Sequence, residues 1–159
     1  MKKLLFFLIL PFVVSSCTIK SKSISGVLFD DALEWIDEVF LEKNKVDLSP
    51  TQSETPKKRT FIVSSDDSFS EIFKAGTEIA PNFQKERIVV YTFFCIYTQT
   101  YHLKNINYKD NIIDISCERS GRSIFSPATG SSCSPYQRWF IIKINTSNYI
   151  ETANVEVIN

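Results

Sequence analysis

The sequence IVVYTFFC, residues 88–95, is apolar at nearly every position and rich in branched and aromatic residues. A strand with one solvent-exposed face would alternate polar and apolar side chains. This run therefore predicts a central strand that is covered on both faces. Cys95 ends the run, and we expect it to behave as a small buried hydrophobic residue.

Further strands are expected before and after this one. Their residues are 61–63 (FIV), 98–108, 113–117, 136–144 (YQRWFIIKI) and, as an edge, 155–158. The alternation within 98–108 changes phase, which predicts a bulge near Asn105, and the sequence Lys109-Asp110-Asn111 predicts a turn. The sequence therefore predicts an α+β, β-rich fold: an antiparallel sheet of about five to six strands, sandwich-like or a partial barrel, with one or two helices.

Two helices are expected before the central strand. The first begins near Asp31, where Asp31 and Glu34 have the spacing of a capping box, and its apolar stripe is Leu33, Ile36, Val39 and Phe40. Trp35 lies at the edge of that stripe, either as core or as an exposed partner-binding residue. A second, shorter helix is expected from Ser68, with Glu71 completing a capping box and Gly76 as a stop.

The chain begins with two lysines and an apolar run, residues 4–14, that ends in small residues. This is the layout of a secretory signal, and it is too short to span a bilayer. The residues Val14-Ser15-Ser16-Cys17 resemble a bacterial lipobox, which implies cleavage after residue 16 and acylation of Cys17. The alternative is a plain signal peptide with a chance cysteine. Thr18, in place of Asp, resembles a signal for outer-membrane sorting, if the host has an outer membrane.

The expected organisation has four parts. Residues 1–16 are the signal peptide, 17–26 a tether, 27–60 an amphipathic helix with a linker, and 61–159 the β-rich domain. The Pro-containing linker, 44–60, leads us to expect that the first helix is joined loosely to the rest. Without residues 1–16, the chain has 16 basic and 18 acidic side chains, so nucleic acid is not an expected partner.

Export would place the remaining cysteines, Cys95, Cys117 and Cys133, where disulfides persist. Three residues allow three pairings, and at most one internal bridge forms. We favour Cys117 with Cys133 because they bracket a segment rich in Ser, Gly and Pro.

The connection 118–135 is the strongest candidate for a binding role. It carries Arg119, Arg122 and Phe125 among small polar residues, which could contact a small anionic ligand or a glycan. The other interpretation is a mobile surface loop with solvated arginines.

Catalytic patterns are weak in this sequence. A nucleophilic-cysteine scheme would use Cys117 or Cys133 with His102, the sole histidine, and Asp114. His102 is expected to face solvent, and the segment Gly130-Ser131-Ser132 lacks a nucleophile elbow. No metal-ligand spacing is present, so we expect no enzyme activity, no metal and no cofactor.

Residues 68–144 resemble accessory lipoproteins of bacterial protease complexes. The similar features are the short helix SFSEIFK (68–74), the entry NFQKE (82–86) into the strand IVV, and the strand RWFIIK (138–143). The family's glycine-tyrosine element is replaced here by YTQTY (97–101). The resemblance implies a noncatalytic role that assists an envelope complex. The lipobox-like residues, the aromatic-rich sheet and the lack of a catalytic pattern lead us to expect a membrane-anchored, noncatalytic protein that binds or stabilises another envelope protein. The alternative is a surface lipoprotein that binds an anionic ligand through 118–135.

Overall fold

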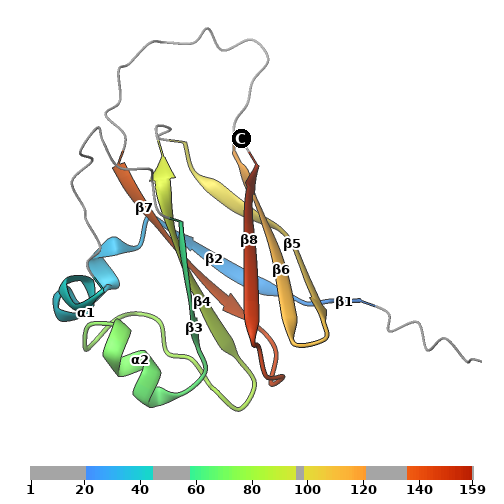
Figure 1. Cartoon of the computed structure of the whole chain (residues 1–159), viewed down its shortest axis with the longest axis horizontal. Coiled ribbons are helices and arrows are strands. Elements are labelled where there is room, and N and C mark those ends of the chain that lie inside the picture. Colours follow the sequence, from blue (N-terminus) through green and yellow to red (C-terminus); the bar gives the residue numbers. More distant parts are fainter. Residues whose placement is uncertain (1–20, 45–57, 96–98, 121–135, 159) are drawn as a thin grey trace, which may run out of the picture.

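The structure is a computed structural model that describes residues 21–44, 58–95, 99–120 and 136–158 (Figure 1). In chain order its elements are β1 Lys22–Ser23, β2 Gly26–Asp30, the 3-10 helix η1 Leu33–Trp35, α1 Glu38–Lys43, β3 Arg59–Val63, α2 Asp66–Ile72, β4 Arg87–Cys95, β5 Tyr101–Lys109, β6 Ile112–Arg119, β7 Tyr136–Ile144 and β8 Thr152–Ile158. No helix among these residues is long and apolar enough to cross a membrane.

Strand β4 lies inside a four-stranded sheet with the order β2-β7-β4-β3. One of its faces places Val89, Tyr91 and Phe93 in the core between the two sheets. Its other face places Ile88 and Val90 in a second core beneath the helices. The prediction of a strand that is covered on both sides is confirmed, because helices cover the face that the second sheet leaves open (Figure 1).

The second sheet has the order β1-β5-β6-β8. The bulge is confirmed, since the register between β5 and β6 shifts between Leu103 and Asn105. The turn is also confirmed: Asp110 and Asn111 have φ values of 52° and 63°, the left-handed pair that a two-residue hairpin needs. Strand β8 forms the expected edge, but it pairs with β6 in parallel.

The α+β, β-rich class with two α-helices is confirmed. Its two sheets match the sandwich-like alternative, but the described residues form eight strands where the sequence predicts about five to six. Two of the additional strands, β1 and β2, lie in the segment interpreted as a tether and the start of a helical unit. Strand β1 has only two residues, and the apolar run Val27-Leu28-Phe29 in β2 does not alternate with polar residues.

The chain changes sheets between β1 and β2. Lys22 and Ser23 pair with β5 of one sheet, whereas β2 pairs along its whole length with β7 of the other. Gly26 stands at this crossover, where an added Cβ would lie 2.6 Å from Ile106 Cδ1 and 2.8 Å from the carbonyl oxygen of Lys143. The crossover therefore joins the two sheets closely on one side of the sandwich.

The first helix is shorter than predicted and begins later. Asp31 has a φ of 58°, and Ile36 is extended and bridges Phe73, so helix α1 starts at Glu38 with Asp37 as its N-cap. Val39, placed by its spacing on the apolar stripe, is 70% exposed. The segment is not loosely joined, because Ile36, Phe40 and Leu41 belong to the core beneath the helices.

Helix α2 is present, but its cap differs from the predicted one. Ser65 is the N-cap and forms a reciprocal capping box with Ser68, so the predicted box of Ser68 and Glu71 is wrong. Gly76 has a φ of 82° but lies beyond the helix, which ends at Ile72.

Candidate functional site

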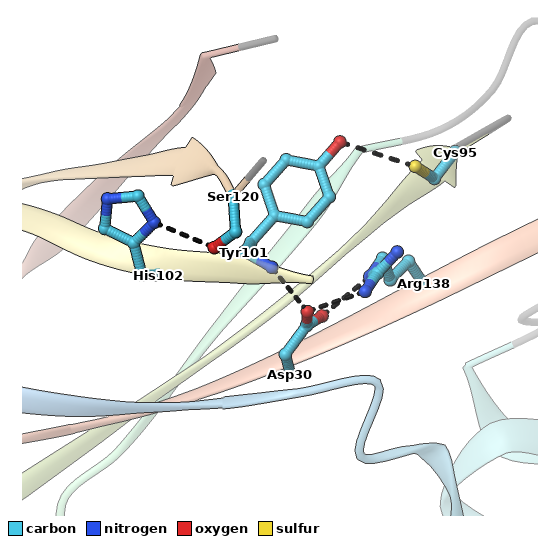
Figure 2. A network of polar contacts seen from close by, with 6 residues as sticks. All are labelled: Asp30, Cys95, Tyr101, His102, Ser120 and Arg138. Carbon is cyan, nitrogen blue, oxygen red and sulfur yellow. Dashed lines mark hydrogen bonds and ion pairs between the residues drawn. The ribbon is translucent and has the colours of Figure 1, made fainter. Parts of the chain in front are cut away.

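A buried polar network lies at one end of the sandwich, which we call the loop end. This is the end at which β4 and β6 finish, at Cys95 and Arg119, and at which β5 and β7 begin, at Tyr101 and Tyr136. Figure 2 shows Asp30 from β2 reaching Arg138 of β7 and the first residue of β5. The network therefore joins both sheets at the end where β4 and β6 finish and β5 and β7 begin.

The centre of this network is a two-pronged ion pair. Arg138 donates from Nε to Asp30 Oδ1 and from Nη2 to Asp30 Oδ2, both at 2.6 Å. The backbone N–H of Tyr101 donates to the same Oδ2 at 2.7 Å. The side chain of Arg138 is 3% exposed and that of Asp30 is 13% exposed. We call Asp30, Tyr101 and Arg138 the clamp, because together they join β2, β5 and β7.

Aromatic and sulfur groups surround the clamp. The guanidinium carbon of Arg138 lies 4.9 Å from the centre of the Tyr101 ring, and the Tyr101 hydroxyl lies 3.5 Å from Cys95 Sγ. Burial raises the pKa of Tyr101, and the neighbouring Cys95 raises it further. Thr92 donates to the carbonyl oxygen of Arg138 at 3.0 Å, and Gln137 donates to Thr92. These contacts favour a rigid structural network.

Cys117 is fully buried in the core between the sheets. Burial raises the pKa of its thiol to about 12, and the negative charge of Asp30 adds to the shift. Cys95 is buried as predicted. Cys117 carries no disulfide within the described residues. Its predicted partner, Cys133, lies outside them, so that bridge stays a prediction.

The predicted binding residues are only partly described. Arg119 is half-buried at the last position of β6, opposite Tyr101 in the register. Arg122 and Phe125 lie outside the described residues. Arg119 is therefore the member of this predicted set that the fold positions at the loop end.

His102 faces solvent, as predicted, with a side chain that is 54% exposed. It contacts Ser120 Oγ at 3.1 Å through Nδ1 (Figure 2). Its Nε2 lies 3.9 Å from Glu118. Cys117 points to the core from the next strand, and Asp114 accepts a hydrogen bond from Asn154 on the outer face. A scheme that pairs His102 with Cys117 does not fit, because their side chains lie on opposite faces of the sheet.

Groups of three or more His, Cys, Asp or Glu side chains that could hold a metal ion are absent from the described part of the chain.

Both charged members of the clamp lie outside the set of residues predicted from the sequence. Arg138 stands within YQRWFIIKI, and a cation inside a strand buried on both faces signals a buried partner. That signal does not identify Asp30, because the two residues are 108 positions apart and meet only through the pairing of β2 with β7.

Comparison with known proteins gives no relative for this chain. No protein-family model matches it, and neither does any curated protein or solved structure. The resemblance of residues 68–144 to accessory lipoproteins therefore stays a prediction from sequence.

Proposed function

We propose that this chain is a lipid-anchored, noncatalytic protein of the bacterial cell envelope that binds or stabilises a partner protein through its loop end. The lipobox-like residues Val14-Ser15-Ser16-Cys17 support the anchor. The clamp supports the binding surface, and it is the observation on which the proposal depends.

The clamp holds the strands from which the connections leave. Tyr101 follows the connection 96–100, and Arg138 lies two residues after the start of β7, which follows the connection 120–135. Binding segments are commonly loops that a rigid scaffold positions. Since Asp30 joins both strands, the anchoring points of the two connections have a fixed separation before any partner arrives.

The loop end also lies opposite the end at which the chain enters the fold. Strand β1 begins beside Tyr108 and β2 begins beside Ile144, at the ends of β5 and β7 that lie far from the clamp. We call this the entry end; in Figure 1 it is the end at which the β5–β6 hairpin turns. A chain anchored through Cys17 would thus present its loop end away from the bilayer.

Site-specific photo-crosslinking in intact cells tests the binding surface. A photoreactive residue at Gln99, which is exposed at the loop end, is expected to capture one defined envelope protein. The matched control is the same residue at Asp110, exposed in the hairpin turn of the entry end. Equal capture from both positions, or none from Gln99, would contradict the proposal.

Intact-mass measurement of the protein from membranes tests the anchor separately. Loss of residues 1–16 and a gain of diacylglyceryl mass at Cys17 are expected. Retention of Met1 or a bare thiol at Cys17 would refute the anchoring.

If the loop end binds a small ligand, a different set of results is expected. If Arg119 and Arg122 hold a small anion or glycan, their joint replacement by alanine removes ligand-induced thermal stabilisation but leaves the capture from Gln99 unchanged.

A further inference from the structure

A polar groove of about 420 Å³ lies at the entry end. It runs between β1, the segment before β4 and the connection from β7 to β8. The residues that matter here are Lys22, Ser23, Gln84, Lys85, Asn145 and Asn148, which we call the basic groove. Its side chains offer cations, amides and a hydroxyl, and no Asp or Glu from the described residues lines it.

The positive charge of the basic groove is not neutralised nearby. Lys22 and Lys85 are exposed and have no carboxylate partner among the described residues. The acid closest in sequence, Glu86, is already engaged. It accepts the N–H of Asn82 at 2.7 Å and pairs with Lys143 at 3.4 Å. That backbone hydrogen bond is the main reason why the pKa of Glu86 is lowered, so this acid is ionised and bound elsewhere.

A third cation lies behind the wall of the groove. Arg87 donates from Nη2 to the carbonyl oxygen of Ser147, a lining residue, at 2.7 Å. Its Nη1 donates to the carbonyl oxygens of Glu86 and Phe83. Its Nε–H is buried and has no acceptor within the described residues. Carbonyl partners leave the charge of Arg87 uncompensated, which favours an anion in the groove.

The groove also lies close to the proposed anchor. Lys22 is five residues after Cys17, and five extended residues reach about 18 Å at most. Tyr149 follows the lining residue Asn148 and is 66% exposed. Exposed tyrosines are enriched where proteins meet the headgroup layer of a membrane.

From this placement we propose that the basic groove binds the phosphate of an anionic lipid headgroup, such as that of phosphatidylglycerol. Phosphate supplies a negative charge that can pair with Lys22 and Lys85. Its oxygens can accept hydrogen bonds from the side-chain amides of Gln84, Asn145 and Asn148. This assignment rests on the proposed lipid anchoring, which brings the groove to the membrane surface. Free phosphate has the same chemistry and is distinguished by the test.

The test uses the intact protein, isolated from membranes and held in neutral detergent micelles. Short-chain phosphatidylglycerol, short-chain phosphatidylcholine or inorganic phosphate is added, and hydrogen exchange is measured at residues 22–25 and 145–149. Phosphatidylglycerol is expected to slow exchange there, while phosphatidylcholine has no effect. In Lys22→Gln/Lys85→Gln, half-maximal protection should need about thirtyfold more phosphatidylglycerol.

The matched control is Lys43→Gln/Lys58→Gln, which removes two exposed lysines from α1 and from the position before β3. It is expected to keep the wild-type response. Equal protection by both lipids, or an equal loss in both double variants, would overturn the proposal.

Protection by inorganic phosphate but not by phosphatidylglycerol would overturn the lipid source and identify a free-anion site. Because the protein is tested in micelles, this result does not depend on the acyl group. A bare Cys17 found by mass would contradict the anchor alone.

Discussion

At Gly26 the packing leaves no room for a side chain. It lies where the chain passes from one sheet to the other, and the position that a Cβ would occupy is already filled on two sides. One of these neighbours is the backbone carbonyl of Lys143, which cannot rotate away as a side-chain tip can. Glycine is required here for close approach rather than for an unusual φ.

We expect Gly26→Ala to lower the free energy of unfolding by about 2 kcal/mol or more, because overpacking forces β2 and β7 apart. Chemical denaturation measures this change. The comparison is Gly76→Ala, where no heavy atom lies within 4 Å of the added Cβ but φ is 82°. That variant should lose about 1 kcal/mol, and Gly76→Asn should lose less. Equal effects at both glycines would contradict the steric argument.

At the scale of single residues, the sequence correctly predicts features that depend only on near neighbours along the chain. The Asp110-Asn111 turn and the phase change before Asn105 depend on neighbours within a few positions, and both are confirmed. Asp31 is a case in which such a local prediction is wrong. Its spacing to Glu34 matches a capping box, but its own left-handed φ ends β2 and keeps it out of a helix.

At the scale of elements, the clamp joins three strands that the chain order separates. Asp30 ends β2, Tyr101 begins β5 and Arg138 lies in β7. A buried ion pair adds less net stability than its geometry suggests, because both charges lose their hydration. Leaving one charge unpaired in the core is costly.

We expect Arg138→Met to destabilise the fold by about 3–5 kcal/mol, since the Asp30 carboxylate stays buried without its partner. The double variant Asp30→Leu/Arg138→Met should be more stable than either single variant. Urea denaturation of the four proteins gives the coupling energy.

The control pair for this cycle is Lys104 with Glu118, which lie 3.2 Å apart with side chains 48% and 38% exposed. Its replacement should change stability by less than about 1 kcal/mol. Additive effects of the two clamp substitutions would argue against a coupled pair.

The helices show why element boundaries were harder to predict than strand identity. Residues 33–40 have helical spacing, yet Ile36 bridges Phe73 in extended form, and the chain makes two short helices around it. Burying Ile36 against α2 and the sheet outweighs the weak preference of an isolated helix of this length.

At the scale of the whole molecule, Cys117 makes stability depend on alkaline pH. The core holds it as a neutral thiol, with a pKa of about 12 against an ordinary 9.0. Its contribution is complete below pH 9. It is lost as pH rises from 9 towards 12, because the unfolded thiol ionises first.

Above pH 9, the free energy of unfolding of the wild-type protein should therefore fall faster than that of Cys117→Ala. The difference between the two slopes should reach up to about 1.4 kcal/mol per pH unit. Urea denaturation of both proteins at pH 7, 9 and 10.5 measures the difference. The variant keeps the tyrosines that also titrate in this range, so the difference reports the thiol together with its effect on the pKa of Tyr91. Parallel pH curves would contradict a titrating thiol, and they are the result expected if Cys117 is bridged to Cys133.

Composition and periodicity alone established the strands of the core, the β-rich class and the turn between β5 and β6, because each depends on which residues are neighbours along the chain. Folding decided the rest. The division into two sheets, the crossover at Gly26, the meeting of Asp30 with Arg138 and the basic groove all bring together residues from distant positions. Their contacts depend on burial and close approach in three dimensions, which no local pattern encodes.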